Sequence, residues 1–254
     1  MLKIIVSALL LSLSPLSYAD CKSLTDSVSK TLGYPDRETE NWFSDCKIHP
    51  VDSSKTIVAL AREQSNPPLD SDAHNLDVLL VDTESGKILQ HLLQEGVFPY
   101  DAIEISGVTI DTARYKLTPE LRAFGVRANF RSNSQRHIFR YETLNLYVSK
   151  DKKLKQVLAK LTTVEYSNSG LEYQQNSEDI CTAIEYDIGR TLAIAKTSTH
   201  SYADLLVQGK TNKSDSNNNC ITSTTKATKQ YTLHFNGDTY VVPDELKYNP
   251  LNVP

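Results

Sequence analysis

The chain has 254 residues, of which 39% are hydrophobic and 23% charged, with 9 glycines and 10 prolines, and this composition excludes collagen-like, coiled-coil and disordered proteins. Its formal net charge of -4 does not supply the positive field on which general nucleic-acid binding depends, so nucleic acid is not expected as a partner. The 13 tyrosines, beside a single Trp and a single Met, suit pleated surfaces better than packed helices. We therefore predict a mainly β protein.

Residues 1–19 predict a secretory signal peptide. Lys3 precedes an apolar run over residues 4–13, and the segment ends on the small residue Ala19. The run is shorter than the roughly 20 residues of a helical membrane span, and no later segment is longer and apolar. We therefore expect a single β-rich domain over residues 20–254, with no membrane span, in the periplasm or secreted.

Four cysteines follow the predicted cleavage site, and an even number in an exported chain predicts disulfide bonds. They are Cys21, Cys46, Cys181 and Cys220. Three pairings are open, and we favour Cys21 with Cys46 and Cys181 with Cys220, because the first two lie near the N-terminus and the last two flank the final repeat described below. The chain has no CxxC motif, which argues against a metal site at these thiols. Asp20, before Cys21, argues against lipid attachment at that cysteine.

One short N-terminal helix is predicted over residues 23–32. Leu24, Val28 and Leu32 recur at helical spacing and share one face, and Gly33 follows as a helix-ending residue. A bridge between Cys21 and Cys46 would hold this helix against the sheet.

Strand-like segments recur with a nearly constant spacing. The first strand of each unit begins 67 and then 68 residues after the previous one, over residues 56–61, 123–128 and 191–196. A second strand follows in each unit, over residues 77–81, 144–148 and 203–207. A turn and a further strand complete each unit, and the last one turns at Asn236-Gly237, a strong hairpin signal. We predict three β-meander repeats in a partial propeller-like fan, a sandwich or a barrel-like wrap, which the periodicity does not separate.

Long polar segments separate the predicted strands. They cover residues 62–75, 131–142, 167–179 and 209–229. Loops of this length in a compact domain are typically functional or mobile. The first two occupy the same place in their repeats, so we expect them on one side of the molecule, as a candidate binding face.

Several runs resemble a group of exported proteins. They are Ile-Asp-Thr-Ala-Arg-Tyr at residues 110–115, the segments 117–119 and 122–127, and later 202–207, 231–233 and 237–243. Over about residues 108–243 the chain resembles an uncharacterised exported β-rich protein family of Gram-negative bacteria, of unknown function. The resemblance implies a periplasmic or secreted location, but it implies no activity.

The sequence contains no GxSxG, no HExxH, no Gly-rich phosphate loop and no complete EF-hand loop, so we predict no catalytic residue, no cofactor and no metal site. The nearest metal-like pattern is Asp70, Asp72 and His74, with Asp77 beyond it. Oxygen and imidazole groups at alternate positions can bind a divalent ion. This segment lacks the Gly of a calcium turn, which favours simple solvation.

Five arginines lie close together in an otherwise acidic chain. They are Arg122, Arg127, Arg131, Arg136 and Arg140. Guanidinium groups bind carboxylates and phosphates through paired donors, so these residues are the candidate binding site for an anion or an acidic protein. The competing interpretation is a solvated strand edge that resists pairing with another edge.

These features favour a non-catalytic periplasmic binding protein that recognises another protein through loops on a rigid β scaffold. An inhibitor or immunity protein against a cell-wall-directed enzyme is one such protein. The alternative is an envelope glycan-binding protein, or a hydrolase with an unrecognised acidic site, and two carboxylates about 5 to 10 Å apart in one cleft would favour it.

Overall fold

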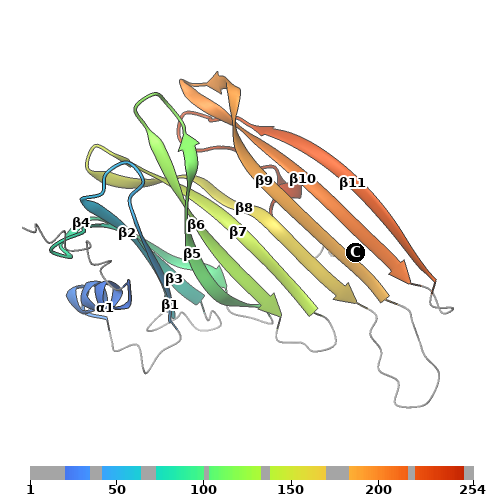
Figure 1. Cartoon of the computed structure of the whole chain (residues 1–254), viewed down its shortest axis with the longest axis horizontal. Helices are drawn as coiled ribbons and strands as arrows, with labels where there is room; N and C mark the ends of the chain where they lie inside the picture. The colour runs from blue at the N-terminus through green and yellow to red at the C-terminus, as the bar shows by residue number, and fades with distance from the viewer. Residues whose placement is uncertain are drawn as a thin grey trace, which may run out of the picture.

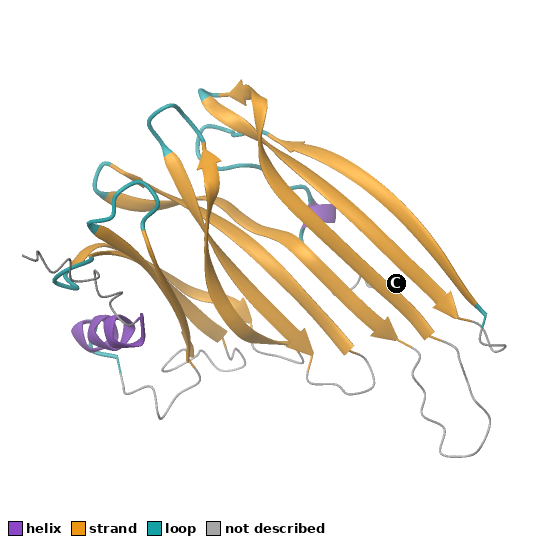
Figure 2. Ribbon diagram, viewed as in Figure 1, coloured by secondary structure: helices purple, strands orange, loops and turns teal. Residues whose placement is uncertain are grey.

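The described residues form one α-helix, one short 3-10 helix and two antiparallel sheets (Figures 1 and 2). The computed structural model describes residues 21–34, 42–63, 73–99, 103–132, 138–169, 183–216 and 221–248. Within these residues, no helix is long and apolar enough to cross a membrane. The mainly β prediction is confirmed.

Helix α1 and the first four strands form the N-terminal part of the molecule. The strands lie in chain order in a four-stranded sheet, and each pairs antiparallel with the next. The elements are α1 (Cys21–Thr31), β1 (Trp42–Ile48), β2 (Lys55–Glu63), β3 (Ala73–Asp82) and β4 (Ile88–Pro99). Strands β2 and β3 are buried on both faces, which explains why they read as continuous apolar runs.

The remaining seven strands form one broad sheet, again in chain order and antiparallel throughout. They are β5 (Ile103–Lys116), β6 (Arg122–Ser132), β7 (Ile138–Lys150), β8 (Lys153–Ser169), β9 (Ala183–Thr199), β10 (Tyr202–Ser216) and β11 (Thr222–Leu233). The short helix η2 (Asp244–Leu246) follows. Because consecutive strands are neighbours, their connections alternate between the two ends of the sheet.

The helix forms as the spacing of its apolar residues predicts. Leu24 and Val28 are buried against the four-stranded sheet, and Gly33 adopts the left-handed φ of 74° that ends the helix. Cys21 forms a disulfide with Cys46 in β1, so this predicted pairing is confirmed. Cys181 and Cys220 lie outside the described residues, and their pairing stays a prediction.

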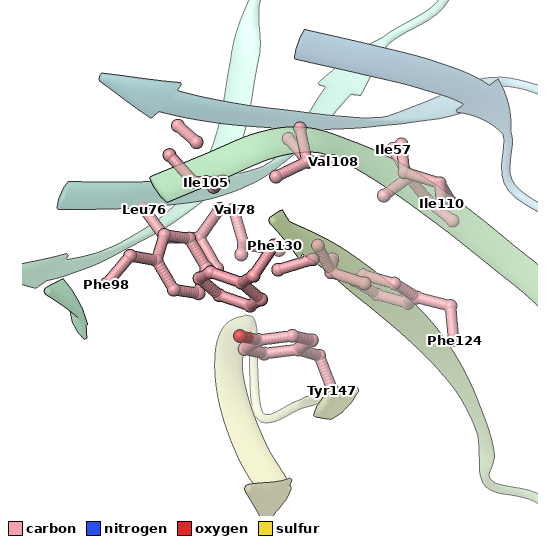
Figure 3. Close-up of a cluster of buried hydrophobic side chains, with 14 of the residues drawn as sticks. Ile57, Leu76, Val78, Phe98, Ile105, Val108, Ile110, Phe124, Phe130 and Tyr147 are labelled. Atoms are coloured by element: carbon pink, nitrogen blue, oxygen red, sulfur yellow. The ribbon is translucent and has the colours of Figure 1, made fainter. Parts of the chain in front are cut away.

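The two sheets pack face to face around the main core. Ile57, Leu76 and Val78 from the small sheet meet Phe124 and other side chains of the large sheet (Figure 3). Strand β1 also contacts the edge of β5, where Asp45 Oδ2 accepts from the Ile110 amide at 2.7 Å and Lys47 Nζ donates to the Ile110 carbonyl at 2.5 Å. The N-terminal part is therefore a three-layer arrangement of helix, small sheet and large sheet.

The far part of the large sheet is covered differently. A second core joins β5–β8, β10 and β11 to the C-terminal segment, which contributes Phe235, Tyr240, Val242 and Leu246. The predicted turn at Asn236-Gly237 forms, with a bridge between Phe235 and Tyr240. Beyond this core β11 is almost entirely exposed, and its Thr- and Lys-rich sequence is that of a solvated edge strand.

The prediction of three separate repeats is not confirmed. The paired strands predicted in each unit do form antiparallel neighbours, as β2–β3, β6–β7 and β9–β10. The first pair belongs to the small sheet, whereas the other two share the continuous large sheet. The described residues form two packed open sheets, which matches the sandwich alternative more closely than a fan of blades.

Parts of the polar segments predicted as loops are paired strand. Strands β10 and β11 extend to Ser216 and from Thr222, so most of the predicted loop over residues 209–229 is paired strand. Likewise, β6 and β7 reach Ser132 and Ile138. Threonines tolerate extended backbone, and hydroxyl pairs such as Ser214–Thr224 at 3.2 Å join β10 to β11. Polarity was therefore a poor sign of loop structure here.

Candidate functional site

Arg127, in the middle of β6, belongs to an ion-pair network within the large sheet. Its Nε and Nη2 donate to Asp111 Oδ2 at 2.9 and 2.7 Å, and its Nη1 donates to Glu142 Oε1 at 2.5 Å. Burial alone would raise the pKa of Asp111, but hydrogen bonds from the Ala113 amide, the Tyr115 hydroxyl and the guanidinium hold it below its ordinary value. Because carboxylates occupy the guanidinium on both sides, Arg127 joins strands and does not offer an open anion site.

The other predicted arginines are divided between the two ends of β6. Arg131 is exposed at one end and lies opposite Arg140 of β7, whose guanidinium sits 4.4 Å from the centroid of the Tyr166 ring. Arg136 lies outside the described residues. Arg122 is at the opposite end of β6. The structure therefore brings Arg131 and Arg140 together and separates both from Arg122.

A cleft of about 660 Å³ opens beside Arg122, where the two sheets meet. Its walls are the β1–β2 turn (residues 49–55), the end of β5 and the β5–β6 turn (residues 119–121), and Ser149 of β7 closes one side. The volume lies within the range of about 300–1,000 Å³ that small-molecule sites occupy. The cleft lies at the end of the strands opposite to the predicted long loops.

The β1–β2 turn is held by its own hydrogen bonds. The His49 amide donates to the Lys55 carbonyl at 2.8 Å, and Asp52 Oδ1 accepts from the Ser54 hydroxyl at 2.6 Å. Lys55 Nζ lies 2.8 Å from Asp52 Oδ2. The bonds from Lys55 and Ser54 lower the pKa of Asp52 to about 2, so this carboxylate stays ionised at neutral pH. The wall of the cleft is therefore a preformed turn.

Arg122 links two walls of the cleft through hydrogen bonds. Its Nη2 donates to the Thr112 carbonyl at 2.7 Å, and its Nη1 lies 3.5 Å from the Pro50 carbonyl. Its Nε is buried without a hydrogen-bond partner among the residues that the structure describes, and the same holds for Nδ1 of His49. Both residues line the cleft, but these two nitrogens are themselves buried beneath its surface. Buried polar atoms in proteins are nearly always paired, so the two are unusual.

The charge of the cleft is opposite to that of the whole chain. Four cationic residues line it against two carboxylates, namely Lys55, Arg114, Lys116 and Arg122 against Asp52 and Glu120, whereas the chain carries -4. Burial, together with the nearby charges of Lys55 and Arg122, lowers the pKa of His49 below its ordinary value despite the opposing effect of Asp52. The cleft therefore combines a neutral imidazole with a surplus of positive charge, and this combination suits an anionic group.

The metal-like pattern lies only partly within the described residues. Asp70 and Asp72 lie outside them, and His74 is buried in β3. Asp77 is bonded to Arg62 at 3.1 Å and to His91 at 2.6 Å. No cluster of three or more potential metal ligands occurs in the described part of the chain.

The cleft was not predicted from the sequence, although one of its residues was. Arg122 was predicted as a binding residue within a charge run, whereas His49, Lys55 and Lys116 were not singled out. These residues come from turns and strand ends far apart in the sequence, so no local pattern joins them.

Comparison with known proteins adds no relative from which a role could be carried over. No protein-family model matches the chain, and no curated protein and no solved structure shows significant similarity to it.

Proposed function

We propose that this chain is an exported, non-catalytic binding protein that recognises an acidic segment of a protein partner in the Arg122 cleft. The observation that carries the proposal is the surplus of cationic side chains that line the cleft, in a chain that is acidic as a whole. A disulfide is typical of the oxidising compartments outside the cytosol, so the Cys21–Cys46 bond supports a periplasmic or secreted location. Inhibition of, or immunity against, a cell-wall-directed enzyme is one role for such a protein.

The lining of the cleft favours an acidic peptide over a bare inorganic anion. Arg114 and Lys116 are exposed and line the cleft, where their cationic groups can donate to a carboxylate. Apolar side chains stand beside these charges, and Val51 is 67% exposed. A large exposed apolar side chain next to a cationic pocket provides contact area for the aliphatic part of a bound peptide.

The test of this proposal is a pair of matched charge-removing variants in β6. Arg122→Gln is expected to weaken binding of an N-acetylated, C-amidated pentaglutamate peptide by about 10- to 100-fold, because a hydrogen bond to a charged group contributes about 1.5–3 kcal/mol. Arg131→Gln removes the same charge from the same strand outside the cleft, and it should change the affinity less than about threefold, since only screened long-range attraction is lost. Isothermal titration calorimetry gives both dissociation constants.

Equal losses in the two variants would show that only net charge matters and would contradict the proposal. Unchanged affinity in Arg122→Gln would do the same. Because Arg122 also bonds the Thr112 carbonyl, thermal unfolding of each variant is measured first. If Arg122→Gln is destabilised, Lys116→Gln is the second variant, because Lys116 is exposed. Loss of this solvent-screened charge should weaken peptide binding about two- to fivefold.

Peptide binding should also depend on pH through His49. In the free protein its pKa lies below the ordinary value of 6.5, because of burial and then of Lys55 and Arg122, with Asp52 opposing. A bound carboxylate favours the protonated imidazole and raises this pKa, so binding takes up a proton in the window between the two values. Affinity is therefore expected to increase as the pH falls through that window.

The pH prediction is checked by following the His49 imidazole in NMR titrations with and without saturating pentaglutamate. The expected result is an upward shift of its pKa in the complex and loss of the pH dependence of affinity in His49→Gln. A pKa that is the same in both states would contradict the placement of the carboxylate beside His49.

A further inference from the structure

A second hollow lies on the large sheet, far along the chain from the Arg122 cleft. It has a volume of about 230 Å³ and is formed by β8 to β11 together with the C-terminal segment around η2. Leu246 is fully buried in the second core, so it anchors this segment while Glu245 and Lys247 form a rim of the hollow. The hollow is thus built by elements that the core holds in place.

The floor of the hollow is open because a glycine occupies the middle of a strand. Gly209 of β10 lies directly between Arg190 of β9 and Lys229 of β11 in the register of the sheet. A Cβ at this position would lie 3.4 Å from Arg190 Cγ and 3.9 Å from Arg190 Nε. Glycine in a strand interior weakens the strand and often marks close approach of a ligand. Here it leaves a space between two cationic side chains.

The polar groups around this space are fixed in position. Arg190 Nη1 donates to Glu165 Oε1 at 2.5 Å and to the Thr162 carbonyl at 3.1 Å, and the Arg190 side chain is only 7% exposed. Lys229 stands exposed on the other side of the gap. Glu165 balances Arg190, and Glu245 also lines the hollow beside Lys229 and Lys247, so the hollow has donors and acceptors but little surplus charge.

Two aromatic residues border the same hollow. Tyr186 lies four residues before Arg190 in β9, and Tyr231 lies two residues after Lys229 in β11, so each points to the same face as its cationic neighbour. Tyrosine combines an apolar ring with a hydroxyl, and it therefore contacts ligands that are partly apolar and partly polar. The hollow thus offers rings, hydroxyls, carboxylates and cations around a flat glycine floor.

We infer that this hollow binds a single sugar ring of a glycan. A sugar presents C–H groups that pack on tyrosine rings, and its hydroxyls both donate to carboxylates and accept from Arg and Lys. The carboxylate of an acidic peptide would be repelled by the carboxylates of the hollow. An aliphatic ligand would leave the polar groups of the hollow buried and unpaired. This inference stands independently of the Arg122 cleft, from which it differs in residues and in ligand chemistry.

The test uses two glycine variants on neighbouring strands. Gly209→Val places methyl groups in the hollow, whereas Gly189→Val, on β9, adds a side chain to the opposite face, where a Cβ meets nothing within 4 Å. Both replace a strand glycine by a β-branched residue, so neither is expected to lower stability through strand propensity. Lys229→Ala is a third variant, because Lys229 is exposed and its loss does not disturb packing.

Binding of glucose, galactose and N-acetylglucosamine is measured by saturation-transfer NMR on the wild type and the variants. We expect at least one of these sugars to bind the wild type and Gly189→Val with a dissociation constant in the millimolar range, and Gly209→Val to bind it at least tenfold more weakly. Lys229→Ala should also weaken it, while all variants keep the pentaglutamate affinity of the wild type. Failure of all three sugars to bind the wild type, or unchanged sugar binding by Gly209→Val, would overturn the inference without affecting the proposed cleft.

Discussion

Replacing Asp77 by alanine is expected to lower the free energy of unfolding by about 3–5 kcal/mol, because it leaves a buried cation without its partner. The Asp77 side chain is fully buried, and it accepts from Arg62 Nε at 3.1 Å and from Tyr34 Oη at 2.9 Å, besides its bond to His91 Nε2 at 2.6 Å. The Arg62 guanidinium also lies 3.8 Å from the centroid of the Tyr34 ring. One carboxylate therefore joins the segment that follows α1 to three strands of the small sheet.

Urea denaturation measures this effect through the shift of the transition midpoint. Asp238→Ala is the matched control, since Asp238 pairs with Lys155 at 2.5 Å with its own side chain 75% exposed, and its loss should change stability by less than about 1 kcal/mol. If the alanine variant does not accumulate as folded protein, Asp77→Asn retains the size of the side chain and should still be strongly destabilised. Similar small losses for Asp77 and Asp238 would contradict the account of this network.

The second large effect is expected from removing the disulfide between α1 and β1. The two cysteines are separated by 25 residues, and the chain-entropy relation gives about 3.5 kcal/mol for a loop of that length. The double variant Cys21→Ser/Cys46→Ser should therefore unfold at a clearly lower temperature than the wild type. Because the bond lies at the first residue of α1, we expect amide exchange in the helix to increase more than in the large sheet.

A reducing agent provides the control for this variant. If the Cys21–Cys46 bond is responsible, dithiothreitol should lower the unfolding temperature of the wild type by at least as much as the double variant does. Equal unfolding temperatures for the oxidised wild type and the double variant would show that the bond contributes nothing to stability.

Local patterns predicted the elements that depend on local chemistry. Helix α1 follows from Leu24 and Val28 at helical spacing and Gly33 at the end, and the turn at Asn236-Gly237 follows from its two residues. The predicted strand pairs formed because strands that are consecutive in the chain are commonly neighbours in a sheet. The repeats did not form separate units, because a regular spacing of hairpins is equally compatible with one continuous sheet.

Two strands escaped the sequence analysis. Strand β1 contains Asp45, Cys46 and Lys47, whose roles are set by β5 and α1 rather than by an alternating pattern. Strand β5 contains irregular pairing with β6 between Ile105 and Gly107 and between Asp111 and Tyr115, which breaks its alternation. Tertiary contacts and bulges therefore determine what periodicity alone missed.

The candidate site was predictable only in part, because tertiary contacts determine it as well. Guanidinium groups were expected to bind anions, but the sequence does not show which of them already have partners. The structure shows Arg127 hydrogen-bonded to the carboxylates Asp111 and Glu142, whereas Arg122 lines the cleft and bonds to backbone carbonyls. Whether an arginine is occupied depends on strand register, which a single charge run does not specify.

The most direct test of the proposed binding cleft is to map the bound peptide on the protein by backbone amide NMR. Pentaglutamate is titrated into the isotope-labelled, oxidised protein, and the chemical-shift changes are assigned to residues. The account predicts that the largest changes cluster at the β1–β2 turn, around His49 and Lys55, and at Lys116 and Arg122. Changes confined to the opposite strand ends near Arg131 and Arg140, or no saturable change at all, would contradict it.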